Sequence, residues 1–196
     1  MISDAGRIPI LVVCTGNICR SPLAEQLFVR QLRGLPFGVS SAGTAARAGT
    51  AMPDAAQAVA LALGAEAPER HRARPLIPQL AAEARLVLTA TRAHRRSVVE
   101  LAPSAVRRTF TLREFARLAA TDPSELPAES GSPHDRFDAL VAALSARRIR
   151  VSAPENDDIV DPYGAATDVY RTSGEQIATA ITPIVTLLRQ RFTQEH

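Results

Sequence analysis

A cysteine and an arginine, Cys14 and Arg20, stand where an apolar run gives way to a stretch with helical character. The run at residues 8–13 is typical of a buried strand. The helix-like stretch starts at Pro22, and the first turn of a helix tolerates proline. A tight loop between a strand and a helix can turn its N–H groups toward one point at the helix N-terminus, where anions bind. The pattern therefore predicts an anion site with the Cys14 thiol beneath it and Arg20 closing over it.

Strands and helices alternate along the rest of the chain. The periodicity predicts strands at residues 8–13, 37–41, 85–89 and 106–110. It predicts helices at residues 22–33, 53–63, 76–83, 92–101, 112–119, 135–148 and 168–192. This alternation is typical of a doubly wound α/β domain with a mostly parallel sheet. Such sheets bind ligands at the carboxyl ends of their strands, where Cys14 begins its loop.

Length and composition limit the classes of protein that this chain can belong to. Its 196 residues fit one domain, and we find no internal repeat. All 23 basic residues are arginine, but the net charge is only +3 and no stripe of aromatic and basic residues is present, so we expect no nucleic-acid partner. No apolar run approaches the roughly 20 residues of a membrane helix. Residues 1–7 lack the features of a signal peptide, so we expect a cytoplasmic protein.

The loop carries the residue types that a thiolate nucleophile needs. A free thiol has a pKa of about 8.5, so Cys14 would need help to ionise at neutral pH. The loop N–H groups, the helix N-terminus and Arg20 would all stabilise its thiolate, and Arg20 can hold two phosphoryl oxygens at once. Gly16 and Asn17 tolerate the positive φ that turns N–H groups inward. The Ser21 hydroxyl can donate to the sulfur. This set favours phosphoryl transfer through a cysteine over a buried structural thiol.

The nine residues from Cys14 to Pro22 have the sequence Cys-Thr-Gly-Asn-Ile-Cys-Arg-Ser-Pro. This string resembles the active-site loop of the low-molecular-weight protein tyrosine phosphatases, and the bacterial members in particular. The resemblance covers roughly residues 8–119 and 157–190. It implies a three-layer fold with a four-stranded parallel sheet and a phosphate-binding loop after the first strand. The residues that it assigns to phosphate binding are Thr15, Gly16, Asn17, Ile18, Cys19, Arg20 and Ser21.

A second motif, Asp161-Pro162-Tyr163, resembles the general-acid loop of the same family. Other cysteine phosphatases carry their acid upstream of the cysteine, where this chain has only Asp4. The resemblance implies that Cys14 forms a phosphocysteine and that Asp161 protonates the leaving phenolate and then activates water. The ordinary alternative for Asp161 is a turn aspartate before proline. Asp157 and Asp158 are the reserve candidates for the acid.

Three further residues match supporting positions of the family. Ser41 and His71 match residues that hydrogen-bond Asn17 and hold the shape of the loop; the alternatives are a capped turn and a surface histidine. Cys19 matches a second loop cysteine that, in many members, forms a reversible disulfide with the nucleophile and protects it from over-oxidation. Its alternative is a small apolar residue beneath the loop. The four histidines form no metal pattern, and we expect neither a metal nor a cofactor.

The chain departs from the family pattern around the expected pocket. Gly164 follows Tyr163 directly, where many members have a second aromatic residue. Residues 44–49 lack another aromatic that often forms the opposite wall, and Arg47 lies there instead, suited to acidic sequence near a phosphotyrosine. Residues 89–92 lack an acidic residue common in the family. We treat residues 1–196 as one domain with an insertion at about 121–156, which would be a lid, a docking surface or an inert insertion.

The leading hypothesis is a phosphatase that acts on phosphotyrosine in proteins, among them a bacterial tyrosine kinase, as a monomer or weak dimer. The alternative is an arsenate reductase on the same fold, since arsenate also fits the loop. A thioredoxin-coupled reductase needs cysteines outside the loop, but a version that uses a small external thiol needs only Cys14. Asp161 favours the phosphatase, because a leaving phenolate needs an acid. A catalytically weak phosphotyrosine-binding module is the third hypothesis.

Overall fold

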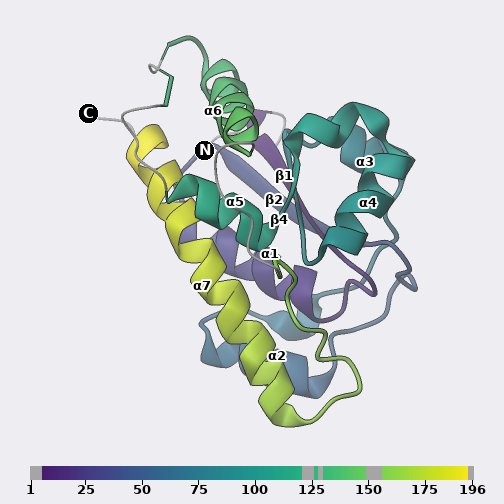
Figure 1. Cartoon of the computed structure of the whole chain (residues 1–196). Coiled ribbons are helices and arrows are strands. Elements are labelled where there is room, and N and C mark those ends of the chain that lie inside the picture. Colours follow the sequence, from purple (N-terminus) through teal and green to yellow (C-terminus); the bar gives the residue numbers. More distant parts are fainter. Residues whose placement is uncertain (1–5, 121–125, 128–129, 149–155, 194–196) are drawn as a thin grey trace.

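The computed structural model describes residues 6–120, 126–127, 130–148 and 156–193. Its centre is a sheet of four parallel strands in the order β2-β1-β3-β4 (Figure 1). The strands are β1 (Ile8–Cys14), β2 (Phe37–Gly43), β3 (Leu86–Thr89) and β4 (Thr109–Thr111). Cys14 pairs with Gly43, and Val13 pairs with Thr89, so the carboxyl ends of three strands meet at one edge. The predicted α/β fold with a four-stranded parallel sheet is confirmed.

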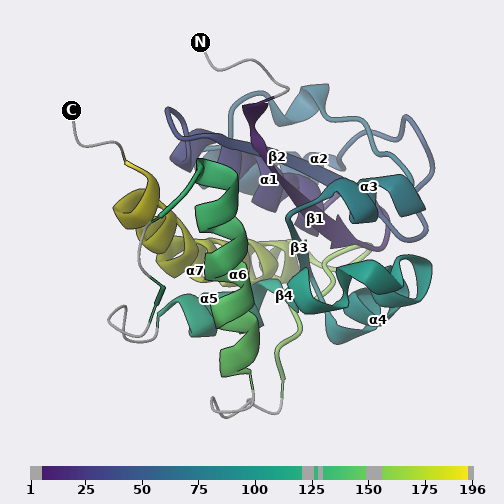
Figure 2. The same cartoon turned by 90° about the horizontal axis from the view of Figure 1, so that it is seen from above.

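Helices cover both faces of this sheet (Figure 2). Their bounds are α1 (Arg20–Gln31), α2 (Asp54–Ala62), α3 (Pro78–Glu83), α4 (Arg92–Leu101), α5 (Leu112–Ala119), α6 (Pro133–Arg147) and α7 (Thr167–Phe192). Each predicted helix therefore appears within two residues of its expected ends. Of the described helices, not even the 26-residue α7 is long and apolar enough to cross a membrane.

The side chains of β1 alternate between two hydrophobic cores. Ile10 and Val12 point into the larger core, which contains residues of α1, α5 and α7. Leu11 and Val13 point into a smaller core with residues of α3 and α4. Because both faces of β1 are buried, its sequence is a continuous apolar run rather than an alternating one. This packing fixes the point at which the chain leaves the sheet after Cys14.

The fourth strand begins later than the sequence predicts. Residues 106–108 belong to a 3-10 helix, Pro103–Arg108, and the strand is only Thr109–Thr111. Pro103 starts that tight turn, and Val106 is 45% exposed rather than buried. The strand ends because Thr111 caps α5 in a capping box with Glu114. The prediction of a strand at 106–110 was wrong for its first three residues.

Helix α6, inside the predicted insertion, lies at the amino ends of the strands. Phe137 packs edge-on against Phe37, the first residue of β2, with ring centroids 5.4 Å apart. Phe192, at the end of α7, completes the ring cluster. Asp138 pairs with Arg85, which immediately precedes β3. The helix therefore lies at the edge of the sheet opposite Cys14, and the role of the predicted insertion stays a prediction.

Candidate active site

The loop between β1 and α1 lies at the carboxyl edge of the sheet, with Cys14 buried at its start. No side chain hydrogen-bonds the first N–H groups of α1 from the cap position, Cys19. The first turn of α1 contains no acidic residue either. A helix N-terminus with uncapped donors carries a partial positive charge. The start of α1 is therefore open to an anion from the side of the loop.

Asn17 is fully buried and holds the loop in its bent shape. Its φ is +52°, in the left-handed region that asparagine tolerates better than most residues. The side-chain Nδ2 donates to Ser21 Oγ at 2.9 Å and to Ser41 Oγ at 2.7 Å. The side-chain Oδ1 accepts from the backbone N–H of Arg74 at 2.9 Å. Both amide hydrogens and the carbonyl oxygen thus have partners, which stabilises a strained backbone.

Two residues, His71 and Gly43, contact the loop from its outer side. His71 Nε2 lies 2.7 Å from the backbone oxygen of Asn17. The backbone of Gly43 lies so close that an added Cβ would be 2.5 Å from the oxygen of Thr15 and 2.8 Å from the nitrogen of Asn17. The structure therefore places Ser41 and His71 against Asn17, as the family resemblance implied. It also adds Gly43, which the sequence did not single out.

The sulfur of Cys14 lies 3.0 Å from the hydroxyl oxygen of Ser21. The Ser21 oxygen accepts from Asn17, and of the two acceptors near its own hydrogen the sulfur is closer than the oxygen of Ala42, which lies at 3.5 Å. A hydrogen bond donated to sulfur favours the thiolate over the thiol. The path Asn17–Ser21–Cys14 thus connects the bend of the loop to the candidate nucleophile.

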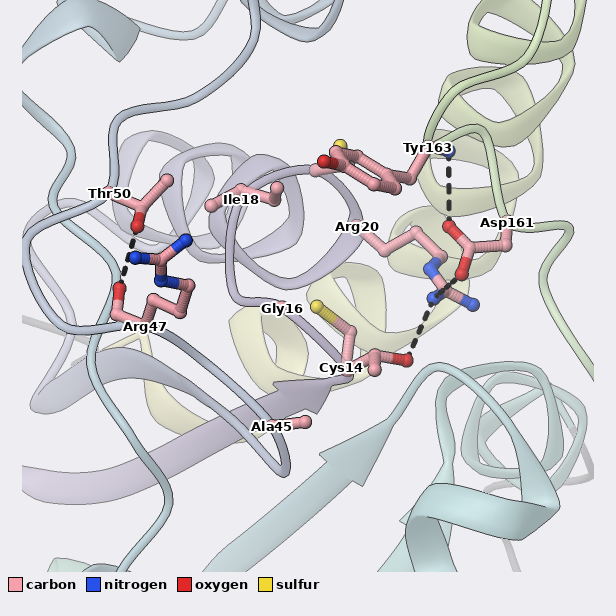
Figure 3. A pocket seen from close by; sticks show the side chains of 11 residues that line it. Cys14, Gly16, Ile18, Arg20, Ala45, Arg47, Thr50, Asp161 and Tyr163 are labelled. Carbon is pink, nitrogen blue, oxygen red and sulfur yellow. Dashed lines mark hydrogen bonds and ion pairs between the residues drawn. The ribbon is translucent and has the colours of Figure 1, made fainter.

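The guanidinium of Arg20 is 5% exposed and lies beside the sulfur (Figure 3). Its Nη2 donates to Asp161 Oδ2 at 2.5 Å and to Thr15 Oγ1 at 3.3 Å, and its Nη1 donates to the oxygen of Ile159 at 3.4 Å. Its Nε is buried and has no acceptor among the described residues. One buried donor of this arginine therefore has no partner among the described residues.

Asp161 reaches the site from a loop whose preceding residues, 157–159, are anchored to other parts of the fold. Ile159 N–H donates to the oxygen of Ala90 at 2.9 Å, just after β3. The carboxylate of Asp157 accepts two hydrogen bonds from Arg117 of α5, at 2.6 and 3.1 Å. Asp158 accepts from the backbone of Arg92 at 2.8 Å. The two reserve acids are thus engaged elsewhere, while Asp161 is half exposed and faces the cavity.

A cavity of about 330 Å³ opens above the sulfur. Ile18 and Tyr163 contribute apolar surface to its walls, and Ala45, Arg47 and Thr50 line the rim away from Asp161 (Figure 3). Tyr163 is 68% exposed, so its ring stands at the mouth with one face in solvent. The expected absence of an aromatic residue in 44–49 leaves a small and basic rim on that side.

Cys19 also lines the cavity but differs chemically from Cys14. Burial, helped by the nearby Cys14, raises the pKa of the Cys19 thiol to about 12. It therefore stays protonated at neutral pH and is a weak nucleophile. Both cysteines are free thiols in this structure, and their pairing under oxidation remains a prediction.

Besides Gly43, three residues that support the site were not predicted from the sequence: Glu25, Arg74 and His94. Ser41 Oγ donates to Glu25 Oε2 at 2.5 Å, and Arg74 Nε donates to the oxygen of Ser41 at 2.6 Å. His94 Nε2 lies 2.8 Å from Thr15 Oγ1, although the two residues are 79 positions apart. The only local signal was Thr91, three residues before His94 and suited to cap a helix. Nothing in the sequence pointed from that cap to the loop.

In this structure a parallel sheet brings a buried thiol beneath an uncapped helix N-terminus. This arrangement is that of α/β proteins that hold oxyanions over a cysteine. Within that class, residues 9–154 match the family model described as "Low molecular weight phosphotyrosine protein phosphatase". The chain belongs to this family.

Relatives with two kinds of name match most of the chain. A protein-arginine-phosphatase of Geobacillus stearothermophilus is 32% identical over 88% of this chain and 90% of its own length. The low molecular weight protein-tyrosine phosphatase A of Mycobacterium bovis is 34% identical over 70% of this chain and 85% of its own. A solved structure of an arginine phosphatase from G. stearothermophilus superimposes with a TM-score of 0.68 at 31% identity, covering 96% of this chain and 97% of that one. The family thus includes proteins named for two phosphorylated residues.

Proposed function

We propose that this chain is a protein tyrosine phosphatase that hydrolyses phosphotyrosine through a phosphocysteine intermediate. The observation that carries the proposal is that Arg20 lines the same cavity as Cys14 while its buried Nε has no acceptor among the described residues. Leaving a buried donor without a partner is costly. A phosphoryl oxygen would supply the missing acceptor, and the first N–H groups of α1 would hold the others.

In the first step the thiolate of Cys14 attacks phosphorus. A sulfur–phosphorus bond forms while the bond from phosphorus to the phenol oxygen breaks. Arg20 and the loop N–H groups stabilise the charge on the three remaining oxygens. Asp161 gives its proton to the leaving oxygen, which departs as tyrosine.

The contact between Arg20 and Asp161 connects substrate binding to this proton transfer. In the free protein the two side chains are 2.5 Å apart. A phosphoryl group that accepts hydrogen bonds from Arg20 competes with the carboxylate for the same donor. Substrate binding would thereby free Asp161 to turn toward the leaving oxygen.

In the second step water attacks the phosphocysteine and the sulfur departs. Asp161, now deprotonated, takes a proton from that water. The Ser21 hydroxyl, 3.0 Å from the sulfur, stabilises the thiolate that leaves. Inorganic phosphate and the starting enzyme are the products.

The walls of the cavity favour an aryl group over a phosphorylated guanidinium. Ile18 and Tyr163 offer apolar surface that suits a phenyl ring. Phosphoarginine carries N–H groups that need acceptors, and Asp161 is the one carboxylate among the described residues that line the cavity. Arg47 adds a positive charge to the rim. Phosphoarginine is nevertheless the rival substrate, because close relatives are named for it.

The proposal includes a cytoplasmic protein whose substrates are phosphotyrosyl proteins, a bacterial tyrosine kinase among them. Two free thiols in one loop suit a reducing compartment. Other relatives carry names of tyrosine phosphatases, such as one from Ralstonia solanacearum at 38% identity over 58% of this chain. The exposed cavity mouth at Tyr163 would admit a side chain presented on a protein surface.

A paired assay tests the function and the roles together. The wild type, Cys14→Ser and Asp161→Asn are given a phosphotyrosine peptide, a phosphoarginine peptide of the same sequence, and arsenate with a small thiol. We expect hydrolysis of the phosphotyrosine peptide by the wild type and no turnover by Cys14→Ser. Asp161→Asn should lose about 10²–10⁴-fold, the usual scale of general acid catalysis. Asp168→Asn, a change of an exposed acid at the start of α7, is the matched control.

Three outcomes would each overturn part of the proposal. Preference for the phosphoarginine peptide would replace the substrate. Arsenate reduction without peptide hydrolysis would replace the reaction. Asp161→Asn at wild-type rates would remove Asp161 from the role of acid.

A further inference from the structure

His94, in the first turn of α4, makes a contact with the phosphate-binding loop. The side chain is 7% exposed, and both ring nitrogens are engaged. Nδ1 lies 2.8 Å from Thr91 Oγ1, and Nε2 lies 2.8 Å from Thr15 Oγ1. Thr91 is itself fixed, because its oxygen caps α4 by accepting from the backbone N–H of His94. The imidazole therefore bridges the start of α4 and the residue next to Cys14.

The hydroxyl of Thr15 extends this bridge to Arg20. Arg20 Nη2 lies 3.3 Å from Thr15 Oγ1, and a guanidinium can only donate, so the Thr15 oxygen is the acceptor. The Thr15 hydrogen is then free to be donated to His94 Nε2. In this arrangement the His94 ring carries its hydrogen on Nδ1 and donates it to Thr91. The lone pair on Nε2 then points toward Thr15 and the positive charge of Arg20. Each hydrogen bond along the path Arg20–Thr15–His94–Thr91 then has one donor and one acceptor.

The surroundings of His94 keep its ring neutral. Burial, with a further contribution from the Arg20 charge, lowers the pKa of His94 to about 4. Asp161 and Asp158 oppose this shift only in part. The ring therefore remains able to accept from Thr15 throughout the neutral range.

We propose that His94 is a positioning residue for Arg20: through Thr15 it fixes the guanidinium over the sulfur of Cys14. The role depends on the proposed phosphatase function, in which Arg20 binds the phosphoryl oxygens. Without the imidazole, the Thr15 hydroxyl is free to rotate and Arg20 loses one of its fixed acceptors. The bond between Arg20 and Asp161 would then be the main restraint on Nη2, and substrate binding breaks that bond.

Two substitutions at position 94 separate this role from simple packing. An asparagine amide reaches the position of Nδ1 and keeps the contact with Thr91, whereas a glutamine amide reaches the position of Nε2 and keeps the contact with Thr15. We expect His94→Asn to lower kcat about 10-fold, the scale of a hydrogen bond to a charged group, with a rise in KM of no more than about fivefold. His94→Gln should stay within about threefold of the wild type.

The Thr15 hydroxyl provides a second, independent test. Thr15→Val removes it while keeping the branched shape, and should match His94→Asn. The double variant Thr15→Val/His94→Asn should lose no more than either single variant, because both remove the same path. Thermal unfolding of every variant shows whether the fold is kept.

The pH profile gives a readout that packing alone would not move. As the pH falls through about 4 the imidazole gains a proton and can no longer accept from Thr15. Wild-type kcat/KM should therefore fall more steeply below pH 5 than that of His94→Gln. The groups that face the ring, Arg20, Asp161 and Asp158, are present in both proteins, so the difference reports on His94.

Equal losses in His94→Asn and His94→Gln, or additive losses in the double variant, would overturn the inference. Failure of the proposed function is recognised separately, because the wild type would then not hydrolyse the phosphotyrosine peptide. Binding of inorganic phosphate still tests His94 in that case. His94→Asn should bind phosphate about fivefold more weakly than His94→Gln, and equal binding would contradict the positioning role.

Discussion

At the scale of single residues, one buried asparagine connects the candidate nucleophile to distant parts of the chain. Asn17 binds Ser41 and the backbone of Arg74, and its own backbone oxygen contacts His71. The same amide orients Ser21 toward the sulfur of Cys14. The shape of the loop and the chemistry of its cysteine therefore depend on the same few hydrogen bonds.

Ser21→Ala should slow the second chemical step more than the first. The hydroxyl stabilises the sulfur when it departs as a thiolate, so its loss should leave phosphocysteine to accumulate. We expect kcat to fall about 10-fold, again the scale of a hydrogen bond to a charged group. Rapid mixing with an aryl phosphate should show a burst of phenol followed by a slow steady rate. Ser104→Ala, an exposed serine after α4, should behave as the wild type, and a burst-free Ser21→Ala would contradict this role.

Residues of the site that are neighbours in the chain could be predicted from the sequence, and residues that only the fold brings together could not. The strand, loop and helix around Cys14 and Arg20 follow from local periodicity, because the residues involved are neighbours in the chain. His94 and Glu25 could not be found in this way. Their contacts with Thr15 and Ser41 exist only once the sheet brings separate segments together.

At the scale of elements, the end of β2 and the nucleophile loop are packed without space between them. Thr44 N–H donates to the oxygen of Cys14 at 2.9 Å, and Gly43 lies directly beneath Thr15 and Asn17. The glycine is needed for this close approach and not for an unusual φ. The strand was predicted from its sequence, but its contact with the loop was not, because that contact depends on register.

Gly43→Ala should therefore distort the loop. Its Cβ would lie 2.5 Å from backbone, which cannot move as a side chain can. We expect a loss of stability of about 1–3 kcal/mol, the usual cost of overpacking, together with a loss of activity. Gly38→Ala, in the same strand, is the matched control, since its Cβ would meet only the Arg7 side chain at 3.3 Å. Urea unfolding and steady-state kinetics measure both effects, and equal behaviour of the two variants would contradict the account.

At the scale of the whole molecule, helix α6 and the candidate site lie at opposite ends of the strands. The aromatic cluster of α6 closes the amino end of the sheet, and the segments that follow β1 and β2, together with the loop before α7, line the cavity at the carboxyl end. The alternation of strands and helices was sufficient to predict this α/β arrangement. It was not sufficient to place α6, because an amphipathic helix can cover any exposed apolar surface.

The central claim is that Cys14 receives the phosphoryl group, and a trapping experiment tests it most directly. The enzyme is mixed with a peptide that carries a radiolabelled phosphoryl group on tyrosine and is denatured within the first turnovers. Ser21→Ala is used beside the wild type because it should retain more label. Cys14 and Cys19 fall in the same tryptic peptide, so Cys14→Ala and Cys19→Ala distinguish them. We predict label on the wild type, Ser21→Ala and Cys19→Ala, and none on Cys14→Ala. Hydrolysis without label, or label that persists in Cys14→Ala, would contradict the account.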